Sequence, residues 1–415
     1  MSREEIEQVE KELDEVLEIV QRPVPVKNTG REETVSLQEN LQENDPLQEE
    51  MQIETEKEEK EEKEDSPESA AKEQTAVSEE ELDLEDDIEN GYFHFLRPSD
   101  GLIAAFFVPV AVLIILFAQR GIFPFGEECF LRTDMYHQYA PFFSEFQYKL
   151  KQGGSLLYSW DIGMGVNFSA LYAYYLASPV NWLIILCPKK FIIEFMTILI
   201  MVKTGLCGVT FTWYLDHHFE KKHFVAGVFG IFYALSGYMA AYSWNIMWLD
   251  CIFLLPLILY GLEQLVQEKK GLFYCVTLGL SILSNYYISI MICIFMVMYV
   301  IVQVILYPPK KIKDLVATGV RFGFYSLLAG GLAAVVLLPE IYALQATASG
   351  DFDFPKTISC YFSIFDMIAR HIGNVGTEIG LDHWPNIYCG VAVLMFLLLY
   401  LGAKKITVRE KAVYC

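Results

Sequence analysis

The sequence predicts an all-α, polytopic membrane protein in which a disordered, acidic tail precedes a bundle of transmembrane helices. Three observations lead to this prediction. The chain of 415 residues is 53% hydrophobic. Its formal charge of −22 is concentrated in residues 1–92, which hold 33 acidic and 9 basic residues, whereas the remainder is nearly neutral. Beyond residue 92, apolar runs recur at roughly 20 residues, the length that a helix needs to cross the hydrocarbon core.

The tail, residues 1–92, has few large apolar groups over most of its length. Such a segment cannot bury enough surface to offset its ordering entropy, so we expect disorder. Residues 3–21 differ, because their apolar side chains recur at helical spacing. They could form a transient amphipathic helix or a helix that docks on a partner. The start of the chain is too acidic for a secretory signal, so the first apolar segment is expected to be an uncleaved anchor.

Eight transmembrane spans are predicted, because a helix that satisfies its own backbone hydrogen bonds is the form in which apolar segments cross a bilayer. A long apolar stretch, residues 271–307, is divided in two by the polar sequence Ser284-Asn-Tyr-Tyr287. The predicted spans are residues 99–118, 191–215, 224–242, 247–266, 271–284, 288–307, 318–338 and 386–403.

The orientation follows from four lysine clusters, Lys221-Lys222, Lys269-Lys270, Lys310–Lys313 and Lys404-Lys405. The positive-inside rule places them in the cytoplasm together with the tail. This parity holds only if the apolar segment 171–187 does not cross, so it is interpreted as an interfacial or re-entrant helix. Large outward loops are then expected at residues 119–190 and 339–385, and the plasma membrane is the expected location.

Six short strings in this bundle resemble the YfhO family of bacterial membrane proteins. They are Asp134-Met-Tyr-His-Gln-Tyr-Ala-Pro141, Gly163-Met-Gly-Val-Asn167, Tyr174-Tyr-Leu-Ala-Ser-Pro-Val-Asn181, Leu235-Ser-Gly-Tyr238, Asn245-Ile-Met-Trp-Leu-Asp250 and Ser284-Asn-Tyr-Tyr287. The resemblance runs from about Pro98 to the end of the chain.

The resemblance implies a GT-C-like helix bundle over residues 93–415, with a large first extracytoplasmic loop. It also implies a glycosyltransferase that takes a sugar from a polyprenyl-phosphate carrier. The implied acceptor is a cell-surface glycopolymer, such as lipoteichoic acid, on the extracytoplasmic face. The family's chains continue into further spans and an extracytoplasmic domain. This chain is therefore expected to be truncated at its C-terminus, and the activity of the truncated chain is a separate question.

Asp134 is the expected catalytic residue. Sugar transfer to a hydroxyl group needs a base that takes the acceptor's proton, and a carboxylate within hydrogen-bond reach supplies one. Asp134 lies about sixteen residues beyond the predicted first span, in a loop that starts and ends at the bilayer. GT-C enzymes place an essential acid in this loop, so the resemblance implies the same role here. The alternative is an N-cap aspartate before a helix over residues 135–150.

Asp250 is the second acid that the resemblance implies, near the reaction centre at an outward helix end. The alternative is a surface cap or a neighbour of the aromatic belt. Asp134 and Asp250 could together hold a divalent cation on a phosphate-linked sugar. That question stays open, because some GT-C enzymes need a metal and others do not, and no other cofactor is expected.

Further candidates for substrate binding flank these acids. His137 and Gln138 could bind sugar hydroxyls, although His137 could equally be a solvated loop residue. Asn285 and Tyr286 are expected to line the cavity, because polar groups at a helix break face protein or water rather than lipid. Arg132 is expected to neutralise the departing phosphate, as is the outward pair Lys189-Lys190.

Two basic residues lie within predicted spans, where a charge is costly and usually functional or paired. Lys203 stands in the middle of its span, and Arg321 lies near a cytoplasmic end from which it could snorkel to the interface. Either could bind the carrier phosphate.

Two other function classes compete with the transferase. A transporter or flippase for a lipid-linked sugar would use the same bundle and carrier, and a non-catalytic scaffold of cell-envelope assembly would recruit partners through its tail. Transporters tend to show internal repeats and polar groups at mid-membrane, and neither is evident here. Nothing in the sequence suggests nucleic-acid binding, and the absence of a glycine-rich phosphate loop leaves ATP-driven transport unsupported.

Overall fold

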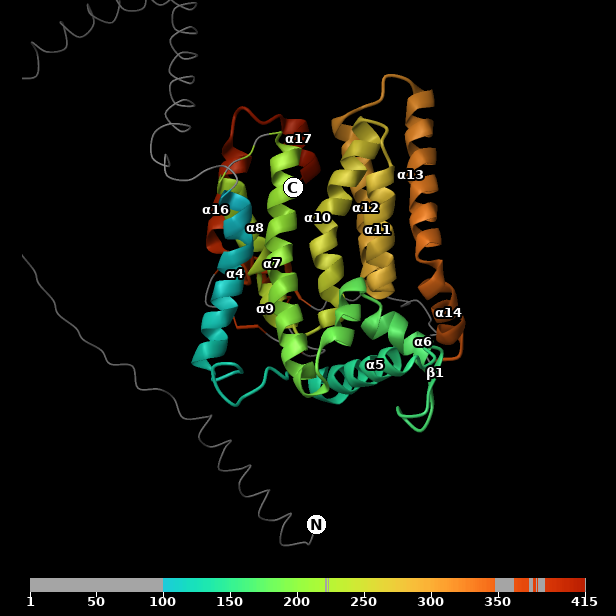
Figure 1. The fold of residues 1–415 in the computed structure, drawn as a ribbon. Coiled ribbons are helices and arrows are strands. Elements are labelled where there is room, and N and C mark those ends of the chain that lie inside the picture. The colour runs from blue at the N-terminus through green and yellow to red at the C-terminus, as the bar shows by residue number, and fades with distance from the viewer. Residues whose placement is uncertain are drawn as a thin grey trace, which may run out of the picture. The chain divides into compact units, whose positions relative to one another are not determined.

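The computed structural model describes residues 100–220, 222, 224–347, 362–372, 376–377, 379 and 385–414. These residues belong to a compact unit, Glu89–Cys415, which is helical almost throughout (Figure 1). The predicted disorder of residues 1–92 and the predicted amphipathic helix at residues 3–21 lie outside the described residues.

The described elements follow one another along the chain as short helices and long helices, with one small hairpin. They are α4 (Asp100–Gln119), η1 (Met135–Tyr139), α5 (Ala140–Gln152), β1 (Tyr158–Ser159), β2 (Val166–Asn167), α6 (Phe168–Leu171), η2 (Tyr172–Leu176), η3 (Pro179–Leu186), η4 (Lys189–Phe191), α7 (Ile192–His218), α8 (Phe224–Ala234), α9 (Gly237–Tyr242), α10 (Ile246–Gln267), α11 (Leu272–Ser284), α12 (Tyr286–Leu306), α13 (Ile312–Leu332), α14 (Ala334–Gln345), α15 (Ile364–Ala369), α16 (Val391–Gly402) and α17 (Val408–Tyr414).

The fold is that of an all-α, polytopic membrane protein, as the sequence predicts. Among the described residues, six helices are long and apolar enough to cross a membrane: Asp100–Gln119, Lys189–His218, Phe224–Tyr242, Ile246–Gln267, Tyr286–Leu306 and Ile312–Leu332. Each overlaps a predicted span.

Three predicted spans differ from the helices found. The predicted span 318–338 is divided at Ala333, because α13 starts directly after the lysine-rich turn and α14 takes over the last six of its residues. Helices α11 and α16 occupy the predicted spans 271–284 and 386–403 with only 13 and 12 residues. At about 1.5 Å per residue neither covers a hydrocarbon core of about 30 Å by itself.

The apolar segment before α7 is sharply bent. Phe168–Leu176 and Pro179–Leu186 meet at 102°, as in a broken span or a re-entrant loop. The bend falls at Ser178-Pro179, because the residue before a proline is driven out of the helical region. Figure 1 shows α6 beside α5 at one end of the bundle, away from α17. This geometry fits the predicted re-entrant helix over residues 171–187, here called the bent segment.

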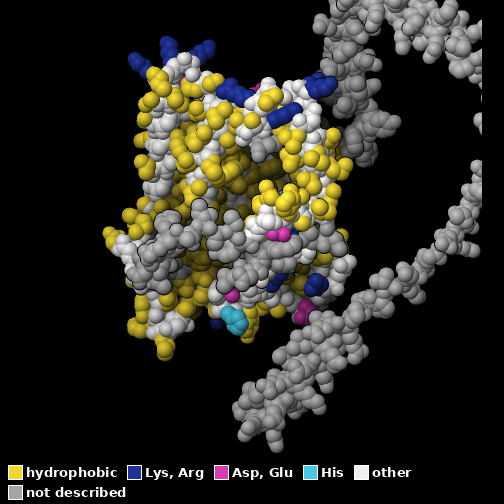
Figure 2. All heavy atoms as spheres, turned by 180° about the vertical axis from the view of Figure 1, so that it is seen from behind, with side chains coloured by type: hydrophobic (Ala, Val, Ile, Leu, Met, Phe, Trp, Pro, Cys, Tyr) yellow, Lys and Arg dark blue, Asp and Glu magenta, His cyan; other side chains and the backbone are white. Residues whose placement is uncertain are grey.

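The described lysine clusters gather at one end of the bundle. The turns after α7, α10 and α12 lie at the same end as α17 (Figure 1), and Figure 2 shows Lys and Arg side chains crowding that end. We call it the basic end, and we call the opposite end, which carries α5 and α6, the distal end. The first loop, residues 119–190, returns at the distal end, where Met135, Phe143 and Phe146 are fully buried.

Candidate functional site

Asp134 lies at the distal end, between two unusual stretches of backbone. Thr133 has a φ of +54°, in the left-handed region that residues other than glycine rarely adopt. The π-helix η1 begins at Met135, and such turns are rare and frequent at functional sites. The Asp134 side chain makes no capping hydrogen bond, and no described residue bonds its half-buried carboxylate. The N-cap alternative therefore finds no support in this geometry.

A second π-helix, η2, packs against η1. The Tyr175 hydroxyl donates to Oε1 of Gln138 over 2.7 Å, and the rings of Tyr175 and Tyr139 are 5.5 Å apart in an edge-to-face arrangement. Tyr139 donates to Oδ1 of Asn245, at 3.1 Å. Burial raises the pKa of Tyr139 well above its usual value, and the neighbouring Tyr175, Tyr174 and Asp134 add to the rise. The Asp134 carboxylate thus faces this tyrosine cluster.

His137 and Arg132, two of the predicted substrate-binding residues, are exposed at the distal end. His137 packs edge-to-face on Tyr136, with ring centroids 5.1 Å apart. Nη1 of Arg132 lies 3.5 Å from the backbone oxygen of Ala240. Neither side chain is fixed by an ion pair within the described part of the chain, so both are accessible to a ligand.

Asn285 and Tyr286 stand at the break between α11 and α12. Asn285 is fully buried and caps α12, accepting from the Ile288 amide at 2.9 Å while its Nδ2 donates to the Tyr174 backbone oxygen at 3.0 Å. Asn285 therefore faces protein and joins α12 to the bent segment. Tyr286 donates to Oε1 of Glu340 at 2.8 Å.

Glu340, on α14, was placed in an outward loop by the sequence. It is 5% exposed, and its Oε2 has no hydrogen-bond partner among the described residues. Burial raises the pKa of this carboxyl, and the bond from Tyr286 lowers it by less. A buried acid with a free oxygen next to the Tyr174–Tyr286 ring pair, whose centroids are 5.8 Å apart, adds a polar group to the site.

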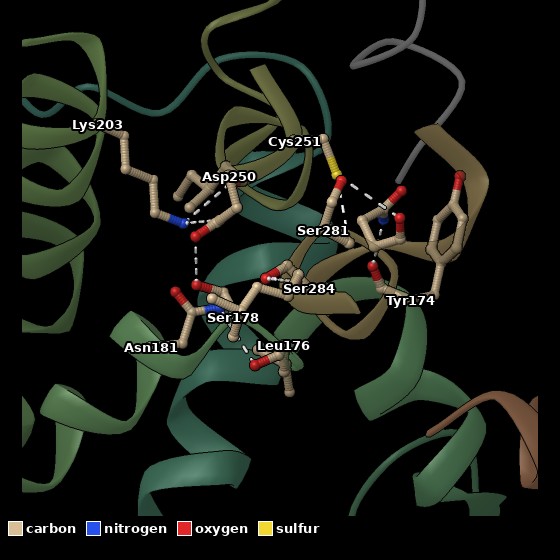
Figure 3. Close-up of polar contacts among 12 residues, drawn as sticks. Tyr174, Leu176, Ser178, Asn181, Lys203, Asp250, Cys251, Ser281 and Ser284 are labelled. Atoms are coloured by element: carbon tan, nitrogen blue, oxygen red, sulfur yellow. Dashed lines mark hydrogen bonds and ion pairs between the residues drawn. The ribbon is translucent and has the colours of Figure 1, made fainter. Parts of the chain in front are cut away.

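Asp250 is not at an exposed helix end, where the sequence placed it. It is the fifth residue of α10 and is 1% exposed. Its Oδ2 lies 2.5 Å from Nζ of Lys203 on α7, and its Oδ1 accepts from the Ser178 hydroxyl at 2.7 Å (Figure 3). Lys203 is fully buried and also donates to the Ile246 backbone oxygen at 3.2 Å. The sequence missed this burial because the partners of Asp250 lie far away in the chain.

The Lys203–Asp250 pair joins three elements: α7, α10 and the bent segment. Figure 3 shows the two side chains pointing toward one another with Ser178 below them. Ser178 stands at the bend, between η2 and η3. The pair thus holds the segment that carries Tyr174 and Tyr175, so it acts on the Asp134 region through position. The signal in the sequence was Lys203 itself, a charge within a span.

A metal site receives little support from the two acids. Both oxygens of Asp250 are engaged by Ser178 and Lys203. Within the described residues, no group of three or more His, Cys, Asp or Glu side chains is arranged to hold a metal ion. Asp134 is left as the acid with open coordination at this end.

The comparison with protein families is decisive for identity. A family model described as bacterial membrane protein YfhO matches residues 104–415. The chain belongs to the YfhO family. The match to this family includes Asp134, the bent segment and both members of the Lys203–Asp250 pair. Searches of curated proteins and of solved structures gave no significant match.

Proposed function

We propose that this YfhO-family chain is the catalytic membrane part of a glycosyltransferase. It would transfer a sugar from a polyprenyl-phosphate carrier to a cell-surface glycopolymer such as lipoteichoic acid. The proposal places the basic end and the N-terminus in the cytoplasm, by the positive-inside rule, and the distal end at the outer face of the plasma membrane.

The observation that carries the proposal is the Asp134 carboxylate. It is half-buried, without a partner among the described residues, and held by a strained residue and a π-turn. Strained backbone persists where the surrounding structure enforces it, and it clusters at functional sites. A carboxylate kept free of internal bonds is available to accept a proton from a bound hydroxyl.

The reaction would proceed in one balanced step. The acceptor hydroxyl oxygen bonds to the anomeric carbon of the sugar as the bond between that carbon and the carrier phosphate oxygen breaks. The electron pair leaves with the phosphate, and the acceptor proton passes to Asp134. Arg132 would counter the charge that develops on the phosphate. Gln138, His137 and Tyr286 are the proposed contacts for sugar hydroxyls.

Replacing Asp134 with Asn tests the proposal, because the amide keeps the shape of the side chain and removes the base. The change is made in the gene at its full length, in cells that lack the native copy, and sugar incorporation into surface polymer is measured. We expect incorporation to fall by about a hundredfold or more at normal abundance in the membrane fraction.

Asp161→Asn provides the matched control for this test. Asp161 is exposed in the same loop, so the same chemical change there should leave incorporation intact. Normal incorporation in the Asp134→Asn cells would overturn the assignment of the base.

A lipid-linked sugar transporter is the second candidate, favoured by the charge pair inside the bundle. Buried charges and discontinuous helices are typical of transport pathways, and the chain has both in Lys203–Asp250 and the bent segment. The two functions differ in where the lipid-linked sugar accumulates. Loss of a transferase leaves it on the outer leaflet, whereas loss of a transporter traps it inside.

A further inference from the structure

A cavity opens beside Asp134, between α4, α7, α8 and α9. Its volume is about 890 Å³, within the range of roughly 300–1,000 Å³ typical of ligand pockets. The strand of chain that closes it from the distal end is Ile122–Arg132, which leads directly into Thr133 and Asp134.

The cavity exists because α4, α7 and α8 touch in one half of the bundle and separate in the other. Toward the basic end, a Cβ on Gly208 would lie 2.1 Å from the Ala105 backbone oxygen, and one on Gly227 would lie 2.5 Å from that of Gly101. Small residues allow such close approach of helices in membranes. Toward the distal end, larger side chains replace them, and the helices diverge around the space that Ile200 and Phe117 line.

The walls of the cavity are apolar, and its charges are confined to the mouth. Val112, Leu113 and Ile200 line the deep part. Thr204 also lines it, but its hydroxyl is engaged by the Ile200 backbone oxygen at 2.7 Å. Leu116 is 46% exposed and lines the same space, so the cavity reaches the lipid-facing surface of α4.

Two arginines and one acid stand at the mouth: Arg120, Arg132 and Glu128. Arg120 directly follows α4, at the level where a membrane span ends. Val112 is eight residues earlier, about 12 Å deeper along the helix axis. Arg132 is anchored above the cavity by its contact with the Ala240 backbone oxygen. The mouth therefore carries net positive charge at headgroup depth above an apolar channel.

We propose that this cavity binds the phosphate end of the lipid carrier, with Arg120 and Arg132 on the phosphate and the first part of the isoprenoid chain between α4, α7 and α8. The inference rests on the proposed function and deepens it, because it states where the donor lies. Arginine forks match phosphate geometry, and the apolar walls suit a hydrocarbon chain. The sugar on that phosphate would then lie at the distal mouth, on the side of Asp134.

Binding of a radiolabelled polyprenyl monophosphate to the purified, detergent-solubilised chain tests this placement without any sugar transfer. We expect Arg120→Ala and Arg132→Ala each to weaken binding by about tenfold, the loss of one charge-assisted contact. Val112→Trp should abolish binding with both arginines intact, because the indole fills the channel. Unlabelled polyprenyl phosphate should compete, whereas inorganic phosphate and phosphatidic acid at the same concentration should not.

Three comparisons keep the outcome interpretable. Lys313→Ala removes the same charge at the basic end and should leave binding unchanged, and Glu128→Gln should leave it unchanged or strengthen it. All variants must elute as folded protein in size-exclusion chromatography. Wild-type binding by the Arg120→Ala/Arg132→Ala double variant would overturn the proposal. So would a loss in Lys190→Ala equal to that in Arg132→Ala, or full competition by phosphatidic acid.

This outcome is separable from that of the proposed function. If the arginine variants bind normally while Asp134→Asn stops incorporation, the carrier site is wrong and the transferase stands. If binding follows the expected pattern while Asp134→Asn incorporates sugar normally, the carrier site stands and the transferase is wrong.

Discussion

At the scale of residues, the buried pair Lys203–Asp250 changes the meaning of Asp250. An acid expected to face substrate is enclosed, with a lysine on one oxygen and the Ser178 hydroxyl on the other. Two charges removed from water are stabilised only while each keeps its partner. Asp250 and Lys203 are therefore positioning residues in this geometry, and Asp134 carries the chemistry proposed for the site.

Lys203→Met should lower stability sharply, by about 3–5 kcal/mol, because it leaves the Asp250 carboxylate buried and unpaired. The double variant Lys203→Met/Asp250→Leu should recover most of the loss. Thermal unfolding of the purified protein in detergent measures both.

The matched control for the pair is Lys270→Met, which breaks the exposed pair Lys270–Glu268 and should change nothing measurable. A double variant as unstable as the single one would refute the expectation. A stable double variant that transfers no sugar would instead assign the pair a direct part in function.

At the scale of elements, glycine spacing decides where helices touch and where they part. The contact of α4 with α7 and α8 depends on positions without a Cβ, so the same three helices can close at the basic end and open at the distal end. The bent segment belongs to this scale too. Its bend at Ser178-Pro179 brings η2 under the break at Asn285, and the two breaks satisfy each other through the Asn285–Tyr174 bond.

Gly208→Ala should destabilise the protein by about 1–3 kcal/mol, since the new methyl group meets the Ala105 backbone oxygen and the helices must separate. Gly319→Ala on α13 provides the control, because a Cβ there meets nothing within 4 Å. It should be neutral or slightly stabilising. Equal unfolding temperatures for the two variants would contradict the close packing of α4 on α7.

At the scale of the whole molecule, charge separates the two ends of the bundle. Lysines occupy the turns after α7, α10 and α12 at the basic end, whereas the long first loop with Asp134 folds over the distal end. This asymmetry is the physical basis for the proposed orientation, because positive loops are retained in the cytoplasm.

Epitope tags inserted after Gly154 and after Lys310 test that orientation. Gly154 lies in an exposed turn at the end of α5, and Lys310 lies in the turn before α13. Antibody should reach the first tag on intact cells and the second only after permeabilisation. The reverse pattern would place Asp134 in the cytoplasm and exclude transfer to a surface polymer.

How much the sequence could predict depends on how local each property is. Hydropathy and lysine positions are written along the chain, and the bilayer sets the length of a span, so the all-α membrane class, the six long helices and the lysine-rich end followed from sequence. The segment at 171–187 was singled out by parity alone, and its 102° bend agrees with that interpretation.

Other features required the folded chain. Asp250 and Lys203 are 47 positions apart, and neither residue's neighbours in the sequence indicate the other. The π-turns that surround Asp134, the bond between Gln138 and Tyr175 and the arginine-rimmed cavity likewise arise where distant segments meet. The sequence by itself determined which residues enter the membrane and which end carries the charge. Only the tertiary structure decided which acid is free and which is paired, because pairing depends on distances between helices that no local pattern encodes.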